Sequence, residues 1–248
     1  MTHRLTRLVT ALTVVAAVLI NALPARAQNE LVDDERVGKA IDRIKNYLYK
    51  NQAANGTWEH LYTAGHVGEG GATVIAVTAL LISGESAQNP KLLKAINWLR
   101  EKNKEEVYQL GGDDTPGKTY VVGLRAHVWG ALPKEYLPLL EREAEWLIGA
   151  AQKEATYNYG WNPKGSRYDH SNTQYGILGL WEAAKRGIHI SSGFWERVED
   201  HFIKVQLPDG GWNYVHSQAR PSYQSMTTAG ITALLTARQE LYATEAPE

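Results

Sequence analysis

The sequence contains no cysteine among its 248 residues. This absence excludes a disulfide scaffold, a thiolate zinc site, a cysteine nucleophile and an iron–sulfur cluster. An excess of charge of one sign is also lacking, because 26 basic residues stand against 27 acidic ones. Without a basic block to neutralise phosphates, we expect no nucleic acid among the partners. The remaining composition, 44% hydrophobic, is that of a globular protein with enough apolar material for a core.

Long hydrophobic runs are scarce, and the one that is present lies at residues 8–23. Arg4 and Arg7 precede this run, and the small-x-small triplet Ala25-Arg26-Ala27 follows it. This order is typical of a secretory signal peptide. The alternative, a membrane anchor, is disfavoured because the run is short for a bilayer span.

The signal pattern predicts removal of residues 1–27 by cleavage after Ala27. Residues 28–248 would then form the mature domain, with 23 basic and 27 acidic residues and a charge of about −4. We therefore expect a periplasmic or secreted protein with no membrane span after signal removal.

The chain contains internal repeats. The pattern Tyr47-Leu48-x3-Gln52-x3-Gly56-x-Trp58 returns 154 residues later as His201-Phe202-x3-Gln206-x3-Gly210-x-Trp212. Two weaker copies lie between them, Trp98-Leu99-x3-Asn103 and Trp146-Leu147 followed by Gln152 and Gly160-Trp161. A second series, Thr73, Thr119, Thr173 and Thr227, opens apolar stretches at spacings of 46, 54 and 54 residues. A period near 50 indicates an array of supersecondary units.

Charge alternates along these units. Segments 33–50, 91–104, 135–154 and 194–206 hold 27 charged residues out of 65, whereas segments 70–83, 119–132, 173–184 and 226–237 hold 2 out of 52, Arg125 and Glu182. Charged amphipathic helices face water, and helices that are apolar nearly all round are buried on most sides. The pattern predicts outer helices that alternate with inner ones.

We expect an all-α fold of about four helical hairpins, each with one inner and one outer helix. Small residues in the inner segments would allow close approach of the helices; these are Gly123, Gly130, Gly176, Gly179, Ala229 and Gly230. The alternative is that the runs 70–83 and 226–237 are buried strands, which is disfavoured because both exceed ordinary strand length.

The Gln-x3-Gly-x-Trp elements, the hairpin period and the segment 171–181 (SNTQYGILGLW) resemble a known family. It is that of the prenyltransferase/squalene-oxidase repeat proteins, in the terpenoid cyclase and protein prenyltransferase α/α-toroid superfamily. More narrowly, the chain is similar to exported bacterial squalene-cyclase-like repeat proteins. The resemblance covers about residues 35–240 and implies an α/α toroid. Because closed rings of that family contain more hairpins than four, it implies a partial or open ring.

The resemblance does not extend to a reaction. Triterpene cyclases carry an Asp-x-Asp-Asp acid motif, and the nearest sequence here, Asp113-Asp114 in a glycine-rich turn, lacks the first aspartate. Protein prenyltransferases hold zinc with Asp, Cys and His, and this chain has no Cys. We predict no cofactor and no metal, since the spacing of His60, His66 and Glu69 matches no standard helical metal site.

The connections that enter the inner helices are rich in aromatic residues, and equivalent loops of a hairpin array lie on one rim. This rim also receives helix N-termini, whose partial positive charge suits an anionic or hydroxyl-rich ligand. The predicted ligand-binding residues are Trp58, Tyr120, Trp161, Asn172, Gln174, Trp212, Tyr214 and Tyr223. The alternative interpretation is structural: the rings seal the loops onto the helices, and each Gln amide binds backbone groups at a neighbouring helix end.

Two functions stay open at this point. The first is an exported module that binds an isoprenoid, lipid or glycan, or a partner protein at the open end of the toroid. The second is an enzyme, a polysaccharide lyase or hydrolase or a cyclase-like isomerase, with Asp169 as the first catalytic candidate and Glu69 as the second carboxylate. Asp169 also precedes a predicted helix, where aspartate is often a cap.

Overall fold

The computed structural model describes residues 34–61, 70–105, 118–216 and 219–242. The chain divides into two parts, Met1–Tyr47 and Leu48–Glu248. Helix α2 (Asp34–Lys50) begins in the first part with Asp34 and Glu35, where the helix dipole favours acidic side chains. The predicted signal peptide, residues 1–27, lies outside the described residues.

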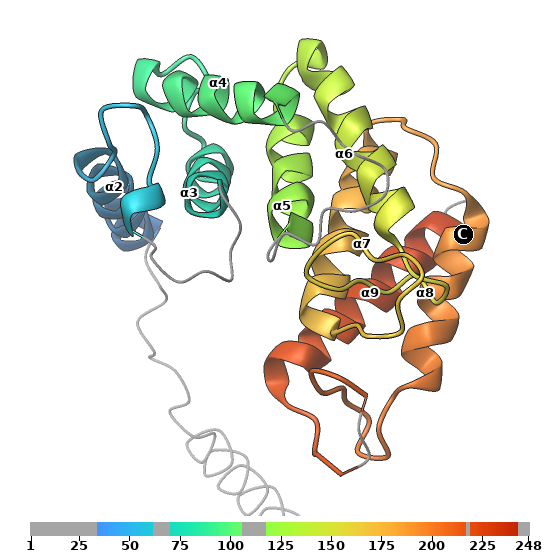
Figure 1. Cartoon of the computed structure of the whole chain (residues 1–248). Helices are drawn as coiled ribbons and strands as arrows, with labels where there is room; N and C mark the ends of the chain where they lie inside the picture. Colours follow the sequence, from blue (N-terminus) through green and yellow to red (C-terminus); the bar gives the residue numbers. More distant parts are fainter. Residues whose placement is uncertain (1–33, 62–69, 106–117, 217–218, 243–248) are drawn as a thin grey trace, which may run out of the picture. The chain divides into compact units, whose positions relative to one another are not determined.

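The second part is built from helices wherever the structure describes it (Figure 1). In chain order they are η1 (Glu59–Leu61), α3 (Gly71–Ile82), α4 (Pro90–Glu105), α5 (Lys118–Ala131), η2 (Lys134–Tyr136), α6 (Leu137–Ala150), α7 (His170–Lys185), α8 (Ser192–Lys204) and α9 (Gln224–Tyr242). No strand occurs in the described ranges, so the strand alternative for 70–83 and 226–237 is wrong. Within those same ranges, no helix has both the length and the apolar character needed to cross a bilayer.

The predicted alternation of inner and outer helices is confirmed. Helix α3 packs against α5, α5 against α7, and α7 against α9, so the apolar helices form one continuous row. The charged helices cover this row, with α4 on α3, α6 on α5 and α7, and α8 on α9. Leu80, Leu92, Leu99, Trp129 and Leu147 are fully buried in the core that these helices share.

The predicted close approach of inner helices is clearest between α5 and α7. A Cβ atom at Gly123 would lie 2.4 Å from the carbonyl oxygen of Tyr175, and one at Gly179 would lie 3.0 Å from the Cα atom of Gly123. No side chain fits between the two backbones at these positions. Glycine is therefore kept in both helices despite its cost of about 1 kcal/mol relative to alanine.

Arg125, one of the two charged residues of the inner segments, is paired inside the core. Its Nε lies 2.8 Å from Oε1 of Glu143 on α6, and its Nη2 donates to Oε2 at 3.3 Å. Trp129 Nε1 and Asn103 Nδ2 donate to the same carboxylate at 3.1 and 2.8 Å. Arg125 and Glu143 are almost wholly buried, so this network joins α4, α5 and α6 through polar contacts in an apolar core.

Glu182, the other charged residue of the inner segments, is paired as well. Lys185 Nζ lies 2.7 Å from its Oε2, and His127 Nδ1 lies 3.4 Å from the same oxygen. Burial opposes ionisation, but the hydrogen bonds from His127 and Lys185 prevail and lower the pKa of Glu182. His127 of α5 therefore contacts a carboxylate of α7.

The loops that enter the inner helices share one hydrogen-bonding pattern. The indole of Trp58 donates to Leu48 O at 2.7 Å, and the indole of Trp212 donates to Phe202 O at 2.9 Å. The glutamine amides of the same loops, Gln52 and Gln206, donate to the carbonyls of Gly56 and Gly210. Gln52 also reaches Lys91 O, in the first turn of α4. The structural interpretation is confirmed for both tryptophans and for Gln52, whereas Gln206 is bonded to its own loop and not to a neighbouring helix end.

The repeated threonines tie each loop to the helix that follows it. Thr73, Thr173 and Thr227 accept through Oγ1 from the backbone N–H groups of Trp58, Tyr157 and Trp212, at 3.1, 3.1 and 3.3 Å. These hydroxyls thus satisfy N–H groups of the loops and not those of the first helical turn. Thr119 differs, since its hydroxyl donates to Asn158 O.

The third loop differs from its sequence-based alignment. Tyr157, not Trp161, takes the place of Trp58 and Trp212, because the Tyr157 hydroxyl donates to Leu147 O at 2.9 Å. Ala155 takes the left-handed position that Gly56 and Gly210 occupy in the other loops, with φ of 55°. The loop spans the same ten residues from carbonyl to donor as the others, but Gln152 stands one residue later in it than Gln52 and Gln206 do in theirs. Gly160-Trp161 falls outside the repeated unit, and the Trp161 ring packs against Trp146.

Candidate functional site

Four tyrosines gather at the N-terminal ends of α5 and α7. We call them the tyrosine cluster: Tyr120 on α5, Tyr175 on α7, Tyr159 on the loop after α6 and Tyr214 on the loop after α8. The rings of Tyr120 and Tyr175 lie 4.5 Å apart, those of Tyr120 and Tyr159 lie 6.2 Å apart, and the hydroxyls of Tyr159 and Tyr214 are 2.7 Å apart. All four side chains are partly exposed.

Backbone hydrogen bonds hold the two loops against the inner helices. Thr119 N donates to Tyr159 O at 3.1 Å, and His170 N donates to Tyr214 O at 2.8 Å. Each bond occupies an N–H group that a helix N-terminus otherwise leaves free. The loop tyrosines are therefore placed by the helix ends, and their rings are not the main anchors of the loops.

Asp169 lies beside the cluster and is the N-cap of α7. Its two carboxylate oxygens accept from Asn172 N and Asn172 Nδ2, both at 2.7 Å. Burial raises the pKa of Asp169, and hydrogen bonds from Asn172 and Tyr214 offset part of that rise. The expectation of an aspartate cap is confirmed. Ser171 lies in the first turn of α7, where its hydroxyl contacts that of Tyr120.

The tyrosines around Asp169 stay protonated at neutral pH. Burial raises the pKa of Tyr120 to about 12, and burial together with Tyr159 and Asp169 raises that of Tyr214. The pKa of Tyr223, which is 45% exposed, is also raised by burial and by the charge of Asp169. Neutral phenols both donate and accept, which suits a ligand that carries hydroxyl groups.

One polar atom next to the cluster is unsatisfied. Asn172 Oδ1 is buried and has no hydrogen-bond donor among the described residues, although its amide nitrogen is bound to Asp169. Buried polar atoms are nearly always paired in folded proteins. An acceptor without a donor at the edge of a hydroxyl-rich cluster is a feature of binding sites.

The structure brings together five of the predicted site residues: Asp169, Asn172, Tyr120, Tyr214 and Tyr223. The others lie elsewhere. Trp58 and Trp212 are 1% and 2% exposed and serve their loops, so they offer no surface to a ligand. Trp161 is half-buried and packs against Trp146 of α6. Gln174 is half-buried near the start of α7, and Glu69 is outside the described residues.

A buried histidine pair lies directly behind Asp169. His170 Nε2 and His201 Nε2 are 3.2 Å apart, and His170 Nδ1 is 2.5 Å from Asn213 O. Because a carbonyl only accepts, His170 carries its proton on Nδ1, and His201 donates from Nε2 to the free nitrogen of His170. In this tautomer His201 Nδ1 carries no proton, so its 3.4 Å approach to Glu154 Oε2 is a contact and not a hydrogen bond. In the part of the chain that the structure describes, no three metal-capable side chains come together.

The histidine pair predicts a loss of stability in mild acid. Burial lowers the pKa of both histidines, and burial with the neighbouring His170 lowers that of His201 from 6.5 to about 4. At pH values between about 4 and 6.5, the unfolded chain binds a proton at His201 that the folded chain does not bind. The free energy of unfolding therefore falls as the pH falls. Urea unfolding at a series of pH values is expected to show this slope.

A His201→Gln variant isolates this effect, because the amide still donates to His170 and cannot titrate. We expect its stability to depend less on pH between 6.5 and 4 than that of the parent protein. An unchanged slope in the variant would show that His201 is protonated in the folded state as readily as in the unfolded one.

Tyr175 and the histidine pair were not among the predicted site residues. A signal for Tyr175 was present, since Tyr120 and Tyr175 follow the repeated threonines Thr119 and Thr173 by one and two residues. The histidines offered no such signal, because 31 residues separate them and His201 lies in a charged outer segment.

The comparisons with known proteins agree with this architecture. Residues 27–106 match the family model of the squalene-hopene cyclase N-terminal domain, a region that includes α2, α3 and α4. The match covers only this N-terminal part of the chain, where it supports a similarity to squalene-hopene cyclase- or prenyltransferase-like repeat proteins, as the sequence motifs indicated. The chain matches no curated protein and no solved structure.

Proposed function

We propose that this chain, a squalene-hopene cyclase-like repeat protein, is an exported module that binds a ligand without transforming it. The sequence lacks the Asp-x-Asp-Asp acid motif and the cysteine of the zinc prenyltransferases. Asp169, the first catalytic candidate, has both carboxylate oxygens engaged by Asn172 as a helix cap. A general acid or base needs an oxygen within reach of the substrate, so this carboxylate is poorly placed for chemistry.

The observation that carries the binding proposal is the tyrosine cluster. Tyr120, Tyr159, Tyr175 and Tyr214 present rings and hydroxyls together, at the N-terminal ends of two inner helices. Aromatic faces pack on the apolar faces of a ligand, while the phenol hydroxyls bind its oxygens. This combination favours a hydroxyl-bearing ligand such as a glycan over a purely hydrocarbon isoprenoid.

Export is the second element of the proposal. It rests on Arg4 and Arg7, the apolar run 8–23 and the triplet that ends at Ala27. A binding module outside the cytoplasm meets cell-envelope glycans and lipids, and these are the two ligand classes that the experiment compares.

The experiment is a thermal-shift screen of the purified chain against separate glycan and isoprenoid pools. A ligand that binds only the native state raises the unfolding temperature by mass action. We expect a hit in the glycan pool, and we expect Tyr214→Phe to weaken the binding about 2- to 10-fold, since one hydrogen bond is removed. Tyr136→Phe is the matched control, because Tyr136 stacks on Trp129 away from the cluster.

Three results would contradict the proposal. A hit in the isoprenoid pool alone would assign the ligand to the other class. Equal effects of Tyr214→Phe and Tyr136→Phe would place the ligand elsewhere on the chain. Steady turnover of a hit compound, lost in Asp169→Asn, would make the protein an enzyme.

A further inference from the structure

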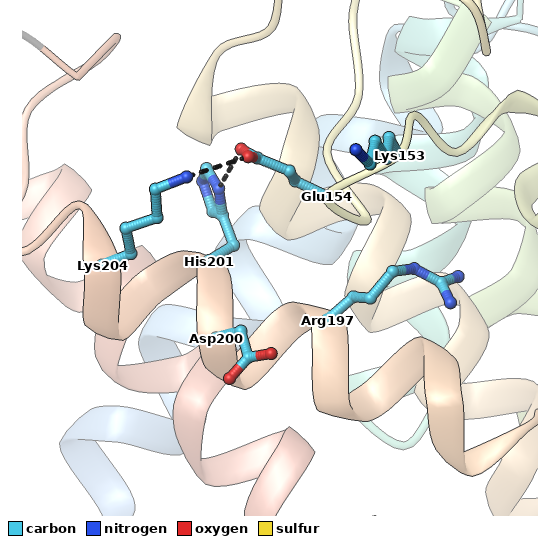
Figure 2. A pocket seen from close by; sticks show the side chains of 6 residues that line it. All are labelled: Lys153, Glu154, Arg197, Asp200, His201 and Lys204. Atoms are coloured by element: carbon cyan, nitrogen blue, oxygen red, sulfur yellow. Dashed lines mark hydrogen bonds and ion pairs between the residues drawn. The ribbon is translucent and has the colours of Figure 1, made fainter.

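A pocket of about 460 Å³ lies between α8 and the loop that follows α6 (Figure 2). Every side chain that lines it is charged or titratable; they are Lys153, Glu154, Arg197, Asp200, His201 and Lys204. The volume falls in the range of small-molecule sites, which are commonly about 300–1,000 Å³. A pocket lined by charged groups alone selects a ligand by charge.

The two walls of the pocket come from different elements. Arg197, His201 and Lys204 stand at spacings of four and three residues on α8, so they share one face of the helix (Figure 2). Lys153 and Glu154 lie on the loop opposite. His201 is held behind this face, with its side chain only 1% exposed, and its Nδ1 is directed at Glu154.

Three cationic side chains line the pocket, Lys153, Arg197 and Lys204, and Lys204 is already neutralised. Glu154 Oε1 accepts from Lys204 Nζ at 3.2 Å, and Glu154 Oε2 lies 3.4 Å from His201 Nδ1. The hydrogen bond from Lys204 is the main cause that lowers the pKa of Glu154, so this carboxylate is ionised. Glu154 therefore forms with Lys204 the ion pair that an acidic ligand would form.

The other two cations are not committed to a carboxylate. Neither Lys153 nor Arg197 forms an ion pair with any residue that the structure describes. Arg197 Nη1 donates to Gly193 O at 2.7 Å. This bond orients the guanidinium and leaves its other N–H groups to bind a ligand. Asp200 is exposed to solvent as Lys153 and Arg197 are, so water and salt screen all three charges alike, and Asp200 forms no ion pair with either of these two described cations. The pocket thus has positive charge available on both walls.

We propose that this pocket binds a small oxyanion, a phosphate or carboxylate group, between Arg197 and Lys153. The guanidinium fork matches two oxygens of such a group, and the ammonium of Lys153 supplies a point charge from the other wall. Glu154 is a competitor inside the site, because it holds Lys204 and repels the ligand. The site is separate from the tyrosine cluster and does not depend on the function proposed for it.

The test is calorimetric titration of the full chain with inorganic phosphate and with D-glucuronate, at an ionic strength held constant with sodium chloride. We expect at least one of the two anions to bind, and the one that binds identifies the group. The double variant Lys153→Gln/Arg197→Gln is expected to weaken the binding at least about tenfold, since two charge-assisted contacts are lost. Lys134→Gln, which removes one exposed lysine charge on η2, is expected to bind like the parent.

A second variant gives an effect of opposite sign. Glu154→Gln releases Lys204 and removes the competing charge, so we expect tighter binding, whereas Glu135→Gln, an exposed change on η2, should have no effect. The proposal is overturned if neither anion binds, if the double variant binds as the parent does, or if Glu154→Gln weakens the binding. Circular dichroism of each variant checks that it is folded.

Discussion

Glu143→Ala is expected to lower the free energy of unfolding by about 3–5 kcal/mol. Glu143 is fully buried and receives Arg125, Trp129 and Asn103 on one carboxylate. The variant leaves the guanidinium of Arg125 in the core without this carboxylate. The desolvation of a charge in such a place is compensated only by its partner. Equilibrium unfolding in guanidinium chloride measures the loss.

The matched control is Glu141→Ala, on the same helix with its side chain in solvent. This change should alter the free energy of unfolding by no more than about 0.5 kcal/mol. A double variant, Arg125→Met/Glu143→Leu, should recover part of the loss, because apolar residues can replace a buried ion pair while Trp129 Nε1 and Asn103 Nδ2 still lose their acceptor. If Glu143→Ala and Glu141→Ala are equally mild, the network does not stabilise the fold.

The second large effect is expected for Trp212→Ala, about 3–5 kcal/mol of unfolding free energy. Trp212 is 2% exposed, its Nε1 donates to Phe202 O at 2.9 Å, and its ring lies so close to α9 that a Cβ atom at Gly230 would be 2.5 Å from it. Removal of the ring leaves a cavity between α8 and α9 and an unsatisfied carbonyl at the end of α8. Thermal and denaturant unfolding both measure this change.

Trp212→Phe separates the two contributions. Phenylalanine keeps most of the buried ring and removes the N–H donor, so a smaller loss of about 1–3 kcal/mol is expected. Ligand binding at the tyrosine cluster should be unchanged in this variant, because Trp212 is enclosed in its loop. A loss of binding with little loss of stability would show that Trp212 touches the ligand.

The helices and their layers were predictable because charge and periodicity both report burial. Arg125 and Glu182, the only charged residues in the inner segments, are the ones that needed partners, and both have them. The end of α6 was less predictable. The charged segment continues to Glu154, but the helix ends at Ala150, because Gln152 N bonds to Thr156 O in the next loop.

The third repeat loop was not predictable from the Gly-x-Trp pattern. Ala155 adopts a left-handed conformation that is uncommon without glycine, and the surrounding hydrogen bonds of Gln152 hold it there. Tyr157 then replaces a tryptophan with a different ring and a different donor. The glycine that stands next to a tryptophan in this segment is Gly160, and it has no part in the repeated unit.

The candidate site was predictable only in part. Equivalent loops of an array share a rim, and this argument leads to Asp169, Tyr120 and Tyr214. The contact between His170 and His201 depends on how α8 packs behind α7, which no local pattern specifies. The same holds for the pocket between α8 and the loop after α6, since its cations come from segments about 45 residues apart.

The loop of Tyr157 shows what evolution can exchange in such a protein. An indole nitrogen and a phenol oxygen are different chemical groups, yet each reaches a carbonyl ten residues upstream and closes the loop in the same way. The three loops share a large side chain that is long enough to reach this carbonyl and that donates a hydrogen bond to it, and the amino acid itself differs. Profiles built on tryptophan alone will undercount the units of divergent relatives, and those that accept any large donor at this place will recover them.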